Sequence, residues 1–195
     1  MSGITAFGAY VPKLRLSRQA AVEANGWFNP ALKGLSRGER AICYWDEDAL
    51  TMAVEAARDC LAGRDRGTID RTMLASTTLP FKDRQNATIL AEALNLSDTV
   101  ASLDIASSLR CGTSALLAAF DAARANEGAQ VLVAAGEHRR AKAASAQELH
   151  YGDAAAALLV GADGVVAQLV GHHQISVDFV DHYRGQSEQF DYYWE

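Results

Sequence analysis

The chain has 195 residues, of which 49% are hydrophobic, and its formal net charge is −6. This length suits one domain with a sizeable core. The acidic balance and the lack of a basic run argue against nucleic-acid binding, and no stretch reaches the roughly 18 consecutive apolar residues of a membrane span. The three cysteines are widely spaced, with no Cys-x-x-Cys pair, which favours reduced thiols, a cytoplasmic location and no metal site.

The first third of the chain contains both extended and helical patterns. Residues 4–11 alternate loosely between apolar and polar side chains and end at a proline, which predicts a strand. Ser17 is a suitable cap for a short helix. We expect Asp46 to cap a longer helix over residues 47–61, where apolar side chains recur at helical spacing. Cys60 lies beside that stripe and is predicted to be a packing residue.

Residues 25–40 form a predicted surface loop, because they contain three glycines and a proline. The loop also carries aromatic and basic side chains. Basic side chains are common partners of phosphate groups, so the loop is a candidate site for an anionic ligand. Ordinary surface charge, with the aromatic rings packed on the core, is the alternative. The candidate ligand-binding residues are Trp27, Lys33, Arg37 and Arg40.

The rest of the chain alternates strands with helices. A helix is predicted over residues 86–94, and the small apolar side chains of residues 154–160 are typical of a strand covered on both faces. The order of elements predicts an α/β fold, with a mixed five-stranded sheet, helices on both faces and a terminal hairpin. The remaining predicted strands lie at residues 72–76, 101–105, 131–135, 165–170 and 175–179.

Cys111 stands at the start of a predicted helix that is apolar on almost all sides, since only Asp121 and Arg124 are charged between Gly112 and Arg124. Such a helix is usually buried. We therefore expect a dry first turn with unpaired N–H groups and a partial positive charge. A thiolate is favoured there, which would make Cys111 a nucleophile near neutral pH. The alternative is an inert buried cysteine.

Several short motifs, in their order along the chain, resemble those of the thiolase superfamily. The resemblance covers about residues 4–180, and it is strongest to the N-terminal half of proteins such as 3-hydroxy-3-methylglutaryl-CoA synthase and ketoacyl-ACP synthase III. Each motif is weak alone, whereas the ordered set is specific. The motifs are Gly8-Ala9-Tyr10-Val11-Pro12, Gly38-Glu39-Arg40-Ala41, Trp45 to Ala57, Asn86 to Leu94, Cys111-Gly112-Thr113-Ser114-Ala115 and Gly152-Asp153-Ala154-Ala155-Ala156-Ala157.

The resemblance implies a thiolase-like half-fold with a buried helix that carries the cysteine. Cys111 falls on the family's nucleophile, which forms an acyl-enzyme from a CoA or carrier-protein thioester. The resemblance thus implies a CoA thioester as substrate and no covalently bound cofactor. The phosphates of CoA would bind the basic residues of the 25–40 loop. The candidate residues of the acyl pocket are Thr77, Thr78 and His150.

Two departures from the family matter. Hydroxymethylglutaryl-CoA synthases carry a glutamate acid/base where this chain has Thr77, and no acidic residue follows before Asp83. A hydroxyl cannot replace a carboxylate as a general base at neutral pH, which favours plain acyl transfer, Claisen-type condensation or thiolytic cleavage. The family also takes its catalytic histidine from a C-terminal half, and the five histidines here lie outside that motif.

We therefore expect a thiolase-like N-terminal domain over residues 1–180 and a polar, aromatic docking or interrupted segment over residues 181–195. The predicted function is an acyl-CoA acyltransferase subunit. The resemblance implies an oligomer in which a second chain supplies the C-terminal half, and it suggests a small zinc- and OB-fold protein as a further partner. The alternatives are a non-catalytic structural subunit and a true hydroxymethylglutaryl-CoA synthase.

Overall fold

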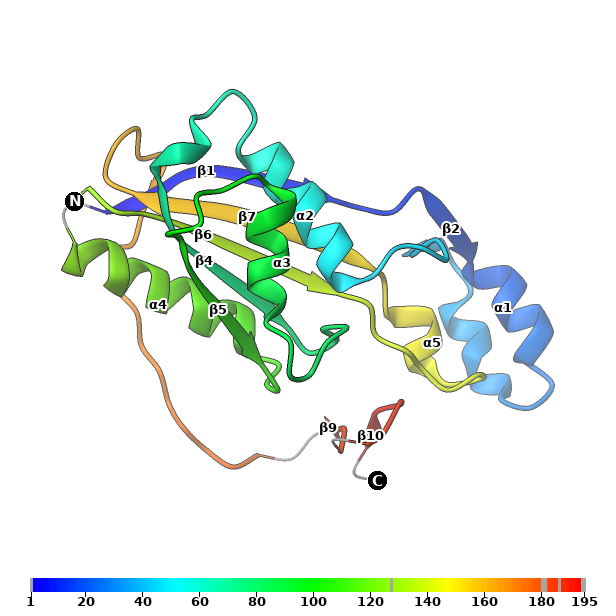
Figure 1. Cartoon of the computed structure of the whole chain (residues 1–195). Coiled ribbons are helices and arrows are strands. Elements are labelled where there is room, and N and C mark those ends of the chain that lie inside the picture. Colours follow the sequence, from blue (N-terminus) through cyan, green and yellow to red (C-terminus); the bar gives the residue numbers. More distant parts are fainter. Residues whose placement is uncertain (1, 127, 180–181, 186, 194–195) are drawn as a thin grey trace.

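A six-stranded mixed sheet forms the centre of the computed structural model, which describes residues 2–126, 128–179, 182–185 and 187–193 (Figure 1). The strand order is β5-β4-β6-β7-β1-β8; β4 runs parallel to β5 and β6, and the other pairs are antiparallel. The mixed sheet is confirmed, but the predicted count of five is wrong because β8 adds a short edge strand. The strands are β1 (Gly3–Tyr10), β4 (Ile69–Ser76), β5 (Ala101–Ala106), β6 (Gln130–Glu137), β7 (Ala154–Gly161) and β8 (Ala167–Gln168).

Helices cover both faces of this sheet, as predicted. On one face lie α2 (Ala49–Cys60) and α3 (Asn86–Ala93), and on the other lies α4 (Cys111–Ala125) (Figure 1). Leu132 of β6 belongs to the core under α2, whereas its neighbours Val131 and Val133 belong to the core under α4. This alternation is the two-residue period of a strand that is buried on both sides.

Small side chains let α2 approach the sheet closely. A Cβ on Gly8 of β1 would lie 2.3 Å from the backbone nitrogen of Cys60, and a Cβ on Gly136 of β6 would lie 2.3 Å from the carbonyl oxygen of Ala49. Both positions therefore require glycine. The sheet-facing side of α2 is built from alanines with no exposed surface, namely Ala49, Ala53, Ala56 and Ala57.

The predicted start of the α2 helix is wrong by two residues. The cap is Asp48 rather than Asp46, because the Asp48 carboxylate accepts the N–H of Thr51 at 2.7 Å and the Thr51 hydroxyl accepts the N–H of Asp48 at 2.7 Å. This reciprocal pair is a capping box. Glu47 lies outside the helix, where its carboxylate accepts hydrogen bonds from the Tyr10 hydroxyl and the backbone of Tyr44. Cys60 is buried in the core, as predicted.

The predicted 25–40 loop is more ordered than expected, since it belongs to a small lobe at one end of the sheet (Figure 1). A core of its own holds the lobe together, and Leu32 and Leu149 are its most buried members. Its elements are β2 (Leu14–Ser17), α1 (Arg18–Asn25), the 3-10 helix η1 (Pro30–Leu35), β3 (Glu39–Ile42) and α5 (Ala146–His150).

The predicted terminal strands are mostly absent. Only β8 pairs with the sheet, and residues 169–179 follow as an irregular segment with exposed apolar side chains such as Val170 and Phe179. A two-stranded ribbon of β9 (His182–Tyr183) and β10 (Tyr192–Tyr193) follows. The predicted boundary at residues 180 and 181 lies outside the described residues.

None of the described helices combines the length and the apolar character that a membrane span needs.

Replacing Gly8 by alanine should destabilise the fold, because the new methyl group would overlap the α2 backbone. Overpacking of this kind costs about 1–3 kcal/mol. Urea denaturation should show that loss in the free energy of unfolding. Gly34→Ala is the matched control, since no atom lies within 4 Å of the added Cβ. Equal stabilities of the two variants would contradict the close contact.

Candidate active site

The carboxyl ends of three adjacent parallel strands meet at one edge of the sheet. Strand β5 leads to Cys111, β4 leads to Thr77 and Thr78, and β6 ends at Glu137. In α/β sheets this is the edge at which ligands bind. The structure therefore brings together three residues that the sequence nominated and adds one that it did not.

A sharp turn places Cys111 at this edge. Only residues 107–110 separate β5 from α4, and Ser107 adopts a left-handed backbone conformation with φ of 66°. The N–H of Cys111 donates to the carbonyl of Ser108 at 3.0 Å, which closes the turn. The cysteine thus occupies the first residue of the helix and is 6% exposed.

The pKa of the Cys111 thiol is raised from its ordinary value. Burial is the largest cause, and the negative charge of Glu137 is the second. Hydrogen bonds from the backbone N–H groups of Gly112 and Cys111 act in the opposite direction, as expected at a helix N-terminus, but they do not outweigh the other two causes. The expected thiolate near neutral pH is therefore not produced by this chain's residues alone.

Glu137 is the site residue that sequence reasoning missed. Its carboxylate accepts the N–H of Thr77 at 2.6 Å and the hydroxyls of Thr77 and Thr78 at 2.9 and 3.1 Å. A carboxylate therefore contacts the position at which the sequence shows only hydroxyls. The one available signal was an acidic residue at the end of a buried strand, and it lies 60 positions from Thr77 along the chain.

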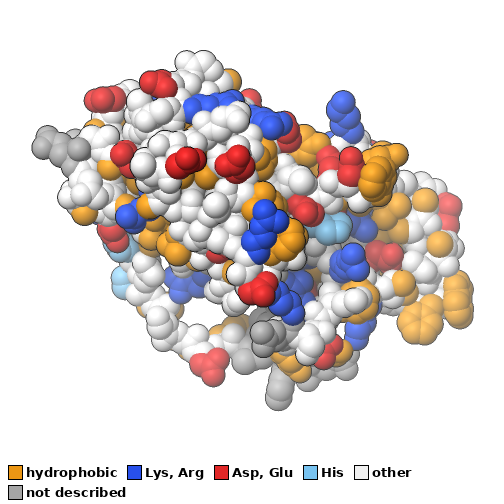
Figure 2. Space-filling model, viewed as in Figure 1, with side chains coloured by type: hydrophobic (Ala, Val, Ile, Leu, Met, Phe, Trp, Pro, Cys, Tyr) orange, Lys and Arg blue, Asp and Glu red, His pale blue; other side chains and the backbone are white. Residues whose placement is uncertain are grey.

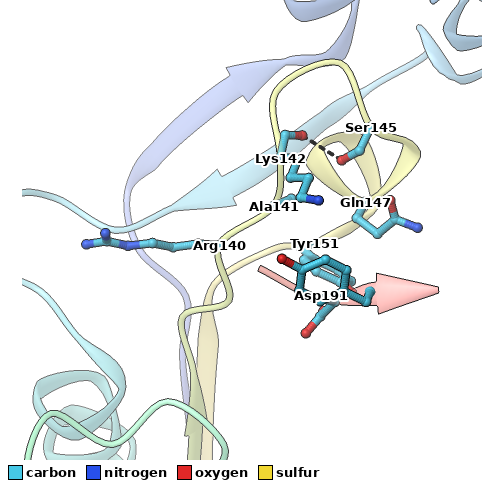
Figure 3. Close-up of a pocket in the computed structure, with 8 residues that line it drawn as sticks. Arg140, Ala141, Lys142, Ser145, Gln147, Tyr151 and Asp191 are labelled. Atoms are coloured by element: carbon cyan, nitrogen blue, oxygen red, sulfur yellow. Dashed lines mark hydrogen bonds between the residues drawn. The ribbon is translucent and has the colours of Figure 1, made fainter. Parts of the chain in front are cut away.

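The end of the chain packs against the same edge. Asp191 is 8% exposed; its carboxylate accepts hydrogen bonds from Arg139 at 2.6 Å and from the Tyr151 hydroxyl at 2.5 Å. The guanidinium of Arg184 donates to the Thr77 carbonyl. A cavity of about 240 Å³ lies beside these contacts, and Figure 3 shows Tyr151 and Asp191 within it, while Arg140 extends away.

The nominated CoA-binding residues are only partly brought together. Trp27 and Lys33 line one open cleft of about 660 Å³. Hydrophobic side chains project from the end of the molecule that holds α1 (Figure 2), and Trp27 is 82% exposed. Arg37 is exposed but does not line this cleft, and the guanidinium of Arg40 donates to the Tyr151 carbonyl at 3.2 Å. The CoA role of all four residues stays a prediction.

Two further expectations concern His150, whose acyl-pocket role stays a prediction, and the burial of α4, which needs correction. His150 is exposed at the end of α5, and its neighbour Tyr151 takes the inward position. The helix α4 is not buried on all sides, since Thr113 and Ser114 are exposed. Its small apolar side chains, such as Ala115 and Ala119, lie on the buried face, while Asp121 and Arg124 are exposed.

Comparisons with known proteins agree with this geometry, although no protein-family model matches the sequence. The hydroxymethylglutaryl-CoA synthase of Aeropyrum pernix is 29% identical over 162 residues, which cover 82% of this chain and 45% of that protein. The structure of MvaS in complex with 3-hydroxy-3-methylglutaryl coenzyme A superimposes with a TM-score of 0.83 at 26% identity, over 98% of this chain and 48% of that one.

The priming β-ketosynthase of the R1128 polyketide pathway gives a TM-score of 0.72 at 25% identity, over 85% of this chain and 51% of that chain. The chain has a thiolase-like fold. Among thiolase-like proteins it resembles hydroxymethylglutaryl-CoA synthases and ketosynthases, as the motifs predicted. It spans about half the length of the curated relatives it matches.

Replacing Glu137 by glutamine should lower the pKa of the Cys111 thiol, because it removes the negative charge that disfavours the thiolate. At a fixed pH below that pKa, more thiolate is then present. Iodoacetamide alkylation of Cys111, followed by peptide mapping across a pH series, should show a midpoint at lower pH.

The matched control is Asp121→Asn, which removes a charge further along the same helix and should leave the midpoint in place. Circular dichroism checks that both variants fold. An unchanged or higher midpoint in Glu137→Gln would show that the carboxylate does not act on the thiol.

Proposed function

We propose that this thiolase-like chain carries the acyl-accepting site of an acyl-CoA acyltransferase. The observation behind the proposal is the position of Cys111, at the first turn of α4 and next to Thr77, Thr78 and Glu137 at the carboxyl edge of the parallel strands. The likeness to hydroxymethylglutaryl-CoA synthases supports the same chemistry.

The proposed first step is a thioester exchange. The Cys111 thiolate attacks the carbonyl carbon of the acyl thioester, a new bond forms between sulfur and carbon, and the bond to the CoA sulfur breaks. The CoA thiolate leaves with the electron pair. Backbone N–H groups at the start of α4, such as that of Gly112, favour negative charge at this position.

The proton of the Cys111 thiol needs an acceptor, because burial and Glu137 both hold the proton on sulfur. We propose that a histidine from the other half of the thiolase-like unit accepts it, as in the family that the chain resembles. The half-length match to the relatives supports a second half, on this protein or on a separate chain.

The proposed substrate is an acyl-CoA. The open cleft beside α1 supplies an exposed aromatic ring in Trp27 and a cation in Lys33, which suit the adenine and the phosphates of CoA. Partnership with a small zinc- and OB-fold protein remains a proposal that rests on family resemblance. The cytoplasmic location, which rests on the sparse cysteines, is a proposal too. So is the division into residues 1–180 and 181–195, which rests on the polar and aromatic character of the second part.

A second candidate function is hydroxymethylglutaryl-CoA synthesis. The sequence counted against it, since Thr77 replaces the family's glutamate, yet the Glu137 carboxylate reaches the same point from β6. An assay with acetyl-CoA and acetoacetyl-CoA separates this reaction from plain acyl transfer. A non-catalytic structural subunit is the remaining alternative, and the next experiment addresses it.

Incubation with acyl-CoA should leave a hydroxylamine-sensitive acyl group on Cys111. The protein is tested alone and with any polypeptide that co-purifies with it, and mass spectrometry maps the adduct. Cys111→Ala should abolish the adduct and lower acyl transfer by at least about 1,000-fold, because the nucleophile is gone. Cys60→Ala is the control, since this buried thiol belongs to α2, on the opposite face of the sheet from α4. Full transfer by Cys111→Ala in the assembled protein would support the structural subunit instead.

Lys33→Glu should weaken CoA binding by about 10- to 100-fold, because hydrogen bonds to a charged group contribute roughly 1.5–3 kcal/mol. Isothermal titration with CoA measures the change. Lys13→Glu is the matched control, as Lys13 is exposed but does not line the cleft. Equal CoA affinities of the two variants would show that the cleft beside α1 does not bind CoA.

A further inference from the structure

Three side chains with metal-ligating atoms meet between the small lobe and the sheet. Cys43 follows β3, His138 follows β6 and Asp153 precedes β7. The Cys43 sulfur, an imidazole nitrogen of His138 and a carboxylate oxygen of Asp153 all lie within 4.8 Å of one another. The three residues come from separate segments, so the fold itself assembles the cluster.

The cluster is held by ordered contacts on its protein side. The Asp153 side chain is 3% exposed, and its Oδ2 accepts the N–H of Cys43 at 2.7 Å. The N–H of Asp153 donates to the Ala41 carbonyl at 3.1 Å, which fixes the backbone of the acid. Hydrogen bonds between Asp153 and the backbone of Ala41 and Cys43 therefore hold Asp153 and Cys43 in place.

The third residue places a second ligand atom against the same carboxylate. The Nδ1 atom of His138 is buried and lies 3.0 Å from Asp153 Oδ2. An imidazole nitrogen and a carboxylate oxygen come this close only with a proton or another cation between them, and a metal ion can take that place. A cation between the imidazole, the carboxylate and the thiol would satisfy all three groups at once.

We propose that Cys43, His138 and Asp153 bind a divalent transition metal, with Zn²⁺ as the cation that fits best. Sulfur, imidazole and carboxylate are the three ligand types that zinc takes in proteins. The thiol disfavours Mg²⁺ and Ca²⁺, which take oxygen ligands. Three protein ligands leave a fourth position for water.

The spacing of the cluster is close to that of a zinc centre. Ligands at about 2.0–2.3 Å from a tetrahedral ion lie about 3.5 Å from one another, so ligand atoms up to 4.8 Å apart need to close in by at most about 1.3 Å. The His138 side chain is 34% exposed and is free to make that adjustment. On the inner side, the buried Met52 sulfur lies 3.6 Å from the Cys43 sulfur, so the ion enters from the histidine side.

The metal would tie the small lobe to the two central strands. It would also stabilise the candidate active site, since His138 directly follows Glu137 and its N–H donates to the Thr78 hydroxyl at 3.0 Å. The sequence predicted no metal site because its cysteines and histidines show no ligand spacing. Ligand spacing detects only ligands that lie close together in the sequence. Here the ligands are residues 43, 138 and 153, which only the fold brings together.

Cobalt substitution tests the proposal on the whole chain. After treatment with a chelator, Co²⁺ alone is titrated into the protein. We expect one equivalent to bind, with a near-ultraviolet thiolate-to-cobalt band and the intense visible bands of a tetrahedral ion; Zn²⁺ should then displace it. Cys43→Ser should remove the thiolate band, and His138→Gln should weaken binding by at least about tenfold.

Cys60→Ala and Cys111→Ala are the matched controls, and both should keep the band, because neither thiol belongs to the cluster. Circular dichroism establishes that each variant is folded. His138 is partly exposed, so its variant remains informative if Cys43→Ser fails to fold. A folded chain that gives no thiolate band, or a band that persists in Cys43→Ser or at full affinity in His138→Gln, would overturn the proposal.

Discussion

The Glu137 carboxylate, held by the Thr77–Thr78 turn, is the interaction on which the candidate site depends. It joins the carboxyl ends of β4 and β6, because both of its oxygens accept hydrogen bonds from the turn. The Thr77–Thr78 turn also contacts the segment that follows the sheet, because the Arg184 guanidinium donates a hydrogen bond to the Thr77 carbonyl. The same negative charge acts on the Cys111 thiol. One acidic side chain therefore links the geometry of the site with its electrostatics.

The electrostatics of Cys111 are the reason that our proposal places a base in another half. Helix N–H groups favour the thiolate, while burial and Glu137 favour the thiol, and the latter two prevail. A buried thiol with a raised pKa needs a base or a cation close by before it can attack a thioester. The half-length match to hydroxymethylglutaryl-CoA synthases agrees with a base that lies in the other half.

The sequence predicted the fold better than it predicted the site. Strands and helices of the core follow from apolar periodicity, which is a local property. The cap of α2 was placed two residues early because Asp46 and Asp48 are both suitable caps, and only the contact with Thr51 distinguishes them. Glu137 and the cluster around Asp153 were missed for another reason. Glu137 lies 60 positions from Thr77, and Asp153 lies 110 positions from Cys43; such pairings arise from strand order rather than from local pattern.

The central claim is that Cys111 accepts an acyl group from CoA. Rapid-quench measurement of free CoA after mixing with acyl-CoA tests it most directly. We expect a burst of one CoA per site before steady turnover, because acylation of Cys111 releases CoA first. A linear release of CoA, with no burst and no covalent acyl group on the assembled protein, would show that Cys111 does not accept the acyl group.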